Sequence, residues 1–408
     1  MKRISPYRTA VERLAGTLYE ALPDRLVDCA GQLHPLLAMM TGLRQSVTEI
    51  SGQTRIGDLP ATVIAAGSGP GVEYILGRFF GGISRRRPIG HVPLYRLPRL
   101  LERLRSDAHL TVVRVDRLSS RLLFSDDYIA VPEWIGGWMA VPADPDRHSR
   151  RNKSLKNDRR KALASGISCR ITRDDAAFEA FYHTMYVPFS ENRYGEEGVV
   201  ANIHQLRRVF RHGGLVLAER EETPLAAALF ARQGSLFKLV VLGTRMGEWA
   251  PVKLGVFWAI YAFCLRHAGR IGCRTIDFGA SRANLYDGVL RYKRKWGVAL
   301  GEKWNARHYF LFYWNALDDR LLNFFQQNPL IFEKNERLWG LMSPFGAAGE
   351  APGSDTVNMA RHAWMPGLQG LYVLCQPNGR RIFPPGIIPI DPGEGGGLSP
   401  KKLSRRIG

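Results

Sequence analysis

The chain has 408 residues, 45% of them hydrophobic, so it exceeds what one core usually serves and carries enough apolar material for a substantial interior. Its 57 Lys and Arg against 37 Asp and Glu give a formal net charge of +20. Such a charge favours an anionic partner, whether phosphate, nucleic acid, acidic sugar or a membrane surface, although a generally basic proteome accounts for it equally well.

Five cysteines are scattered along the sequence, odd in number and never paired as C-x-x-C, which argues against a disulfide framework and against a zinc site. Charged residues interrupt the apolar run that an N-terminal signal peptide would need. The longest apolar run, residues 254–265, is well short of the ~20 residues that span a membrane. We therefore expect a cytoplasmic protein with no transmembrane segment and no metal.

The predicted secondary structure of the first part of the chain changes near residue 60. Apolar positions at Leu14, Leu18 and Leu22 predict a helical segment over residues 1–58. The elements expected next are a strand at 61–66, a helix at 72–80, a basic turn at Arg85–Arg87, a helix near 98–105, a strand at 110–115 and a strand-like stretch at 122–141. The break at Pro142–Pro145 predicts a domain boundary.

A strongly basic segment follows this boundary. Residues 147–161 contain eight Lys or Arg and a single acid, Asp158, so the segment is not a helix laced with intrahelical ion pairs. It is a candidate surface for RNA or lipid phosphate. Solvated charge on an ordinary helix explains the segment equally well.

The next part predicts a mixed α/β (α+β) domain. Its expected elements are strand 167–172, helices 176–187 and 203–210, strands 215–220, 225–232 and 236–243, helix 252–267, strand 275–278, a short helix from about Asn284, and strand 298–309. Three successive strands joined by tight turns exclude a doubly wound Rossmann sheet, which needs a helix between its strands. A helix near 317–325, a linker at 347–354 and a flexible tail from 384 to 408 complete the prediction.

One stretch, residues 273–297, contains the most specific pattern. An apolar strand ends at Asp277, the chain turns at Gly279, and a short helix brings Tyr292, Lys293 and Trp296 back toward the strand end. Together with the order of elements over 147–311 and the basic helix ending at Gly166, this pattern resembles the FemAB-like and CelD/BioF-like branch of the GNAT acyltransferase superfamily. The resemblance covers about 165 of the 408 residues.

The resemblance implies a GNAT-like mixed central sheet flanked by helices, in two GNAT-like halves of which the first is degenerate. The expected division is a helical segment at 1–58, the degenerate half at 59–145, the acyltransferase domain at 146–312, a helical extension at 313–346, and a linker and tail at 347–408. It also implies a donor, either acetyl-CoA or another acyl-CoA, or aminoacyl-tRNA. The acceptor implied is an amine of a polysaccharide or cell-envelope precursor.

The family's lysine in the aromatic-Lys segment before the final strand falls on Lys293. The resemblance therefore gives Lys293 a catalytic role, because a fixed ammonium stabilises the oxyanion that acyl transfer creates. A solvated lysine among other basic residues is the alternative. Asp277 is the candidate general base, or else a helix cap or an ion-pair partner of Arg282. No Ser-His-Asp or Cys-His pair indicates a covalent intermediate.

The donor loop departs from the family pattern. GNAT proteins that use acetyl-CoA carry a [QR]-x-x-G-x-[GA] loop before the central helix, and residues 245–255 lack the full motif. Arg245, Lys253 and the amides near Val252 remain the expected phosphate-binding groups. The donor therefore stays open between CoA and aminoacyl-tRNA.

Candidate acceptor-binding residues lie on two helices. They are Tyr182, Tyr186 and Arg193 on or after the first helix of the domain, with Arg282 and Tyr292 near the second. A core or surface role for each is the alternative. We expect a phosphate-bearing or otherwise anionic substrate, with tRNA and peripheral contact to a membrane-linked precursor as further partners. The competing hypothesis is a non-catalytic protein that binds RNA or an anionic polysaccharide through a basic face.

Overall fold

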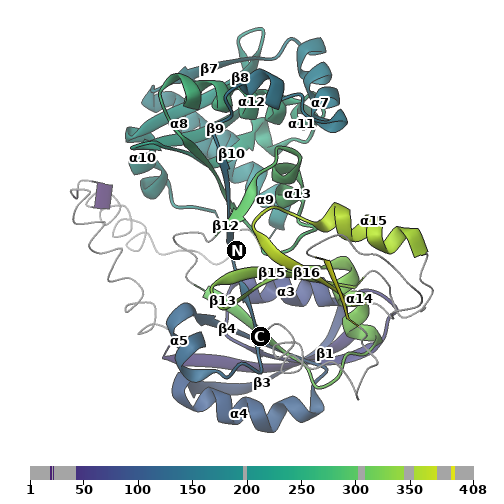
Figure 1. Cartoon of the computed structure of the whole chain (residues 1–408). Helices are drawn as coiled ribbons and strands as arrows, with labels where there is room; N and C mark the ends of the chain where they lie inside the picture. The colour runs from purple at the N-terminus through teal and green to yellow at the C-terminus, as the bar shows by residue number, and fades with distance from the viewer. Residues whose placement is uncertain are drawn as a thin grey trace. The chain divides into compact units, whose positions relative to one another are not determined.

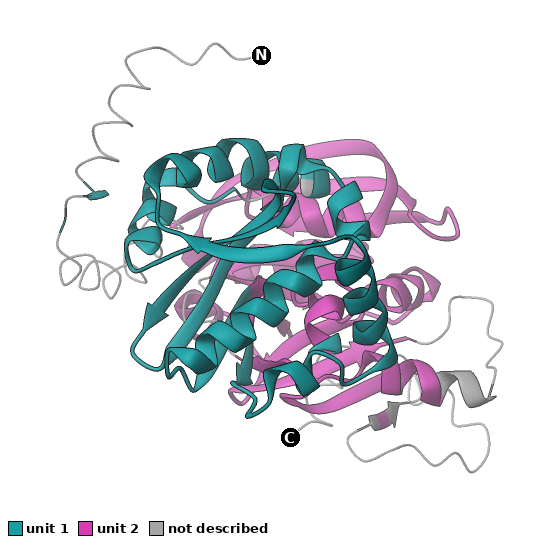
Figure 2. Cartoon of the chain, turned by 90° about the horizontal axis from the view of Figure 1, so that it is seen from above, with its two compact units in different colours: residues 1–33, 138–279, 295–297 teal, residues 34–137, 280–294, 298–408 magenta. Residues whose placement is uncertain are grey.

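The computed structural model describes residues 19–20, 22, 43–195, 200–301, 308–343, 353–374 and 387–390. Its contacts divide the chain into two units, which Figure 2 shows in different colours. Unit 1 comprises residues 1–33, 138–279 and 295–297, and unit 2 comprises residues 34–137, 280–294 and 298–408. The units are thus interleaved along the sequence, which a division into consecutive domains does not anticipate.

Unit 2 is built on a ten-stranded mixed sheet of order β17-β16-β15-β14-β5-β13-β4-β2-β1-β3. Its elements (Figure 1) are β1 Arg44–Thr54, β2 Pro60–Ala66, α3 Pro70–Phe79, β3 Phe80–Pro93, η1 Leu94–Arg96, α4 Leu97–Leu104, η2 Arg105–Asp107, β4 Leu110–Asp116, α5 Arg117–Leu123, β5 Ile129–Pro132, β12 Ala299–Gly301, β13 His308–Tyr313, α14 Asp319–Gln327, β14 Leu330–Lys334, β15 Arg337–Met342, α15 Gly353–Ala363, β16 Leu368–Leu374 and β17 Ile387–Ile390. Strands β6 Ile135–Ala140 and β11 Thr275–Ser281 and helix α13 Gly288–Lys295 each cross a unit boundary.

The core of unit 2 joins the centre of this sheet to helix α4. Leu97 and Leu101 of α4 are fully buried against Ile64 of β2 and Val113 of β4. The two leucines are four residues apart, so they lie on the same face of the helix. Burying such side chains stabilises the unit by about 1.5–3 kcal/mol each.

Unit 1 contains a second mixed sheet in which the strands follow the order β6-β11-β10-β9-β8-β7. Its other elements are α6 Pro145–His148, α7 Lys153–Ala164, β7 Ser168–Thr172, α8 Asp175–Phe181, the π-helix η3 Tyr182–Tyr186, α9 Val187–Tyr194, α10 Ile203–Arg211, β8 Gly213–Arg220, β9 Thr223–Gln233, β10 Leu236–Thr244, η5 Arg245–Gly247, α11 Ala250–Lys253, α12 Val256–Arg270 and β11 Thr275–Ser281. Strands β7 to β10 pair antiparallel, and β10 pairs parallel with β11.

Both faces of the unit 1 sheet are covered. Leu215 and Leu217 of β8 pack in one cluster with Phe178 of α8 and Phe210 of α10. The intervening residue, Val216, is also fully buried. Because neighbouring side chains of a strand point to opposite faces, β8 must be covered on its other face as well, where α12 contacts it.

The structure confirms the predicted mixed α/β class, with two mixed sheets flanked by helices. Most predicted elements are present within a few residues of their expected limits, including the three successive strands β8, β9 and β10. These strands were predictable because each is an uninterrupted apolar run bounded by a turn.

Three predictions in the first part of the chain are wrong. Residues 44–54, expected to be helical, form strand β1, in which Val47 and Ile50 are buried. The basic turn at Arg85–Arg87 is part of the long edge strand β3, where exposed arginines are tolerated and suppress pairing with another chain. The strand-like stretch at 122–141 is instead the end of α5 followed by strands β5 and β6.

Two further predictions near residue 290 need correction. The short helix starts at Gly288, because the Asp287 carboxylate accepts hydrogen bonds from the first amides, at Val289 and Leu290, as a helix cap does. The strand expected at 298–309 is two strands, β12 and β13, and β13 pairs with β4 and β5 in unit 2. The predicted helical extension at 313–346 contains α14 but also strands β14 and β15, and the predicted linker and tail at 347–408 contain α15, β16 and β17, with much of the remainder outside the described residues.

Among the described residues, no helix is both long and apolar enough to cross a membrane. The same part of the chain contains no cluster of three or more His, Cys, Asp or Glu side chains that would hold a metal ion.

Candidate functional site

The neighbouring strands β10 and β11 of unit 1 run parallel but pair only near their starts. The recorded pairs are Leu236 with Thr275, Phe237 with Ile276, and Lys238 with Asp277. Both strands continue beyond the last of these pairs, and each lies entirely within the described residues. Beyond Lys238, β10 still pairs with β9 as far as Thr244, so only the main-chain groups on its β11 side are candidates to bind an extended ligand chain.

The pairing stops where β11 bends at Gly279. This residue has φ +72°, a left-handed conformation that glycine adopts without strain. Its amide donates a hydrogen bond of 2.8 Å to Oδ1 of Asp277. A Cβ atom on Gly279 would lie 2.9 Å from the carbonyl oxygen of Leu239 on β10. Asp277, predicted as a general base, thus holds the bend with one carboxylate oxygen.

Strand β10 carries two further irregularities. Val240 has no partner in the pairing with β9, because the register shifts between Leu239 and Val241, which is a β-bulge. A Cβ atom on Gly243 would lie 2.5 Å from the carbonyl oxygen of Met185 in η3. The main chains of β10 and η3 thus touch where a side chain would intervene. Bulges of this kind often occur beside active sites, where they redirect a strand.

The π-helix η3 contains the two predicted tyrosines. Tyr182 donates its hydroxyl to the carbonyl oxygen of Ala201 at 3.1 Å, and the hydroxyl of Tyr186 accepts from the amide of the same residue at 2.9 Å. Burial raises the pKa of both phenols, so both stay neutral near pH 7. The two hydroxyls thus hold the main chain at Ala201 against η3. A π-helix frequently occurs at a functional site, which makes η3 a candidate part of the site.

The predicted cationic residues of unit 1 lie around the end of β10. The Arg193 guanidinium lies over the rings of Phe189 and Trp249, 5.9 and 5.7 Å from their centroids. Arg245 in η5 and Lys253 in α11 are exposed. Gly255, at φ +90°, then precedes the first residue of α12. The chain between β10 and α12 thus presents cations on the surface.

Lys293 of α13, in unit 2, is buried, with 1% of its surface exposed. Its ammonium donates hydrogen bonds to the carbonyl oxygen of Ala280 at 3.0 Å and to the hydroxyl of Ser281 at 2.9 Å. A Cβ atom on Gly137 would lie 3.4 Å from Cδ of Lys293, so the glycine leaves room for the side chain. Lys293 is therefore not a solvated surface charge, and it holds the end of β11.

Arg282, predicted to bind substrate, is also buried in unit 2. Its guanidinium forms an ion pair of 3.3 Å with Glu133 and lies 4.0 and 4.7 Å from the ring centroids of Trp134 and Tyr74. Arg114 donates two hydrogen bonds to the other oxygen of Glu133. The arginine thus belongs to a buried ionic network, and its role toward a substrate stays a prediction.

The remaining predicted residue, Tyr292, is half-buried on α13. The structure places Asp277, Arg245, Lys253, Tyr182, Tyr186 and Arg193 in unit 1, and Lys293, Arg282 and Tyr292 in unit 2. The bulge at Val240 and the close approach at Gly243 were not predicted. Gly243 is a glycine near the end of the apolar strand β10, and that position was the available signal for a close approach of two main chains.

No family model and no curated protein matches the chain. Solved structures that resemble it include FemX, which is 14% identical, with 62% of this chain and 82% of FemX covered at a TM-score of 0.36. L-PGS from Bacillus licheniformis is 11% identical, with 65% and 83% covered at a TM-score of 0.34. A GCN5-related N-acetyltransferase from Sphaerobacter thermophilus is 11% identical, with 65% and 75% covered at a TM-score of 0.28.

The identities of these structures are low and the overlaps are partial, so they assign no residue and no substrate to this chain. Any functional assignment rests on the geometry of the chain itself.

Proposed function

We propose that this protein is a GNAT-type acyltransferase that moves an acyl or aminoacyl group onto an amine. The observation that carries the proposal is that the pairing of the parallel strands β10 and β11 ends after Lys238 and Asp277, with a bulge at Val240 on one strand and a bend at Gly279 on the other. In this proposal the main-chain groups of β10 that face β11 beyond this point bind the amide-bearing arm of a donor such as acyl-CoA.

The donor's phosphates are assigned to the segment that follows β10. Arg245 and Lys253 are exposed there, and the first amides of α12 follow Gly255. Because the segment lacks the family's full loop motif, the same groups also suit the phosphates of an aminoacyl-tRNA. The proposal therefore includes both donors, and the binding experiment below distinguishes them.

The reaction is a direct transfer between two bound substrates. The acceptor amine attacks the donor carbonyl carbon, a C–N bond forms, and the C–S bond of a thioester or the C–O bond of an aminoacyl ester breaks. The proton lost by the amine ends on the leaving sulfur or oxygen. The two catalytic roles are proposed for each residue by itself: Lys293 stabilises an oxyanion, and the second oxygen of Asp277, or a water, takes a proton from the amine.

The acceptor proposed is an amine on a polysaccharide or cell-envelope precursor that bears phosphate or another anionic group, encountered in the cytoplasm or at the membrane surface. The net charge of +20 supports an anionic substrate because it raises the encounter rate.

The first experiment is isothermal titration with acetyl-CoA and with free CoA. Micromolar binding is expected, weakened in Lys253→Ala and unchanged in the matched control Lys161→Ala, an exposed lysine of α7. If neither ligand binds while aminoacyl-tRNA supports transfer, the donor is aminoacyl-tRNA. If no donor binds and RNA binds with steep salt dependence, the protein is a non-catalytic binder and the proposal fails.

The second experiment tests Lys293 by turnover. Lys293→Met keeps the length of the buried side chain and removes its charge, and it should lower kcat about 100-fold with little change in KM. Arg291→Met, an exposed cation on the same helix, is the control and should retain activity. A wild-type kcat in a folded Lys293→Met protein would restrict Lys293 to a structural role.

A further inference from the structure

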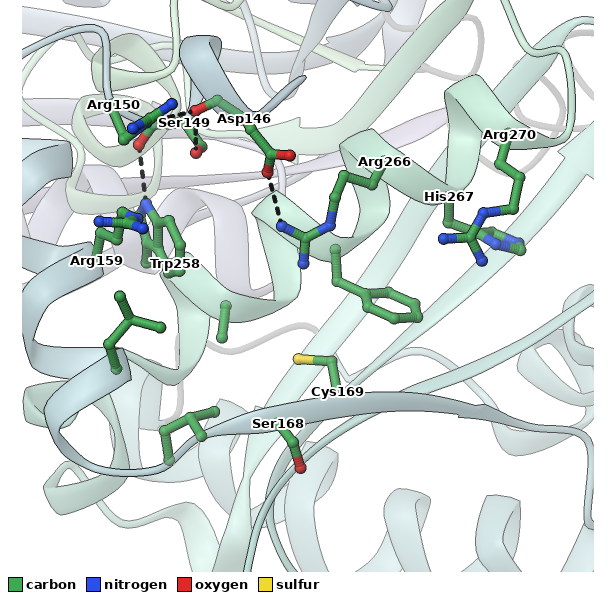
Figure 3. Close-up of a pocket in the computed structure, with 14 residues that line it drawn as sticks. Asp146, Ser149, Arg150, Arg159, Ser168, Cys169, Trp258, Arg266, His267 and Arg270 are labelled. Atoms are coloured by element: carbon green, nitrogen blue, oxygen red, sulfur yellow. Dashed lines mark hydrogen bonds and ion pairs between the residues drawn. The ribbon is translucent and has the colours of Figure 1, made fainter. Parts of the chain in front are cut away.

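A cavity of about 590 Å³ opens in unit 1 between α7, β7 and α12 (Figure 3). Leu163 and Ile167 line it at the end of α7, Cys169 comes from β7, and Trp258 and Phe263 come from α12. Its volume lies within the range of about 300–1,000 Å³ that is usual for sites of small organic ligands. The apolar lining provides contacts for an aromatic or aliphatic group.

The charged part of the lining is strongly basic. Four arginines, Arg150, Arg159, Arg266 and Arg270, line the cavity, and Asp146 is its single carboxylate. Asp146 pairs with Arg266 at 2.9 Å. Within the described ranges no ion pair is recorded for Arg159 or Arg270. The cavity therefore has an excess of positive charge that an anionic ligand would neutralise.

The wall of the cavity is held in place by hydrogen bonds. The Trp258 indole donates to the carbonyl oxygen of Ser149 at 3.1 Å, and Arg150 Nε donates to the carbonyl oxygen of Asp146, also at 3.1 Å. In Figure 3 Arg266 and Arg270 project from α12, Arg150 and Arg159 lie at the left near Ser149 and Trp258, and Cys169 and Ser168 lie on β7 opposite. Such preorganisation lowers the ordering cost of binding.

The cavity lacks an activated nucleophile among its described lining residues. Burial raises the pKa of the Cys169 thiol to about 12, so the thiol is neutral near pH 7 and does not attack a carbonyl or phosphoryl group. Burial, together with the charges of Arg270 and Arg173, lowers the pKa of His267, so its imidazole is neutral there too. The chemistry present is that of binding.

We infer that this cavity binds a small phosphorylated ligand whose body is aromatic or aliphatic. Arginine holds phosphate through paired N–H donors, and the lining supplies such groups beside an apolar surface. The cavity adjoins the proposed donor segment, because Trp258 and Ala259 line it within one turn of the first residue of α12, and the main chain at Asp158, next to Arg159, lies against Gly255. The inference goes beyond the proposed transfer reaction, and the acetyl-CoA titration below distinguishes its ligand from the donor.

The test is calorimetric titration of the full-length protein with phenyl phosphate. Phenyl phosphate should bind more tightly than either inorganic phosphate or phenol, since only the ester fills both parts of the cavity. Arg159→Ala and Arg270→Ala should each weaken binding about tenfold, as loss of a charged hydrogen bond does. Arg220→Ala, an exposed arginine of β8 that does not line the cavity, is the matched control and should bind like the wild type.

A second pair of variants separates charge from shape. Leu163 is 56% exposed at the cavity, so substitutions there should leave the fold intact. Leu163→Asp places a carboxylate beside the arginines and should abolish phenyl phosphate binding, whereas the neutral Leu163→Asn should retain most of it. Equal binding by wild type, both arginine variants and Leu163→Asp would overturn the inference.

Two further titrations establish which ligand class occupies the cavity. Acetyl-CoA affinity should be the same in wild type and Arg159→Ala, and its loss in the variant would mean that the cavity belongs to the donor site. An RNA oligonucleotide that binds through Arg159 and Arg270 while phenyl phosphate does not would assign these arginines to a nucleic-acid surface and overturn the small-ligand inference.

Discussion

Two arginine-rich regions, one in each unit, differ in what surrounds their guanidinium groups. In unit 2, Arg114 and Arg282 converge on the buried carboxylate of Glu133, and the space beside them is only about 20 Å³. In unit 1, four arginines line a cavity of about 590 Å³ with a single acid. The comparison teaches that a nearby buried carboxylate makes arginine part of the core, whereas its absence leaves the charge available to a ligand.

The largest expected effect is on the unit 2 cluster. Glu133→Gln removes the charge that both arginines share and leaves the Arg282 guanidinium buried without its partner, which should reduce the free energy of unfolding by about 3–5 kcal/mol. Urea denaturation followed by circular dichroism measures it. Glu102→Gln, an exposed residue of α4 in the same unit, should change stability little. A small loss in Glu133→Gln would mean that the cluster is not ionic in solution.

Removing one arginine of that cluster should have a smaller effect. Arg282→Met takes away one ion pair and the contacts with Trp134 and Tyr74, but Glu133 keeps its two hydrogen bonds from Arg114. We expect a loss of about 1–3 kcal/mol in the same measurement. If Arg282→Met lost more free energy of unfolding than Glu133→Gln, the expected ranking of the two substitutions would be wrong. The aromatic contacts of Arg282 would then contribute more than its ion pair.

Substituting the arginines of the cavity should hardly change the stability of the protein. Arg159→Ala and Arg270→Ala should each leave the free energy of unfolding within about 0.5 kcal/mol of the wild type, as is usual for surface changes. Thermal unfolding in parallel with phenyl phosphate titration tests the contrast between the two regions. A marked destabilisation by either substitution would place these arginines in the same structural class as Arg282.

The smallest effect concerns the pH dependence of stability. The pKa of His267 is lowered in the folded protein by burial and by the charges of Arg270 and Arg173. Its contribution to stability is therefore complete above the ordinary pKa of about 6.5 and is lost as the pH falls through the lowered value. Between pH 7 and 5 the wild type should lose more stability than His267→Gln. Parallel curves for the two proteins would exclude this contribution.

The sequence allowed the class of fold and much of the element order to be predicted. The runs that form β8, β9 and β10 are apolar and separated by short polar turns, so their order follows from local pattern. Gly279 was recognised as a bend because glycine is a local signal, whereas β11 continues past Asp277, which was predicted to end the strand, as far as Ser281.

The features that were not predicted depend on contacts between segments that are distant in the sequence. A strand pairing register has no local signature, so neither the bulge at Val240 nor the end of pairing after Lys238 was predictable. The cavity joins Arg159 of α7 to Arg270 of α12, residues separated by more than one hundred positions. The basic segment at 147–161 predicted anion binding. The sequence of helix α12 is typical of a buried core helix, so its contribution to the cavity was not predicted.

The interleaving of the two units affects how the chain folds during synthesis. Strand β4 of unit 2 pairs with β13, which is made only after nearly all of unit 1 has been made. Neither unit can therefore complete its sheet and leave the ribosome before the other has been started. Contacts of such wide sequence separation slow folding and prolong the exposure of apolar strands. The nascent protein is thus expected to depend on chaperones more than a chain of two consecutive domains would.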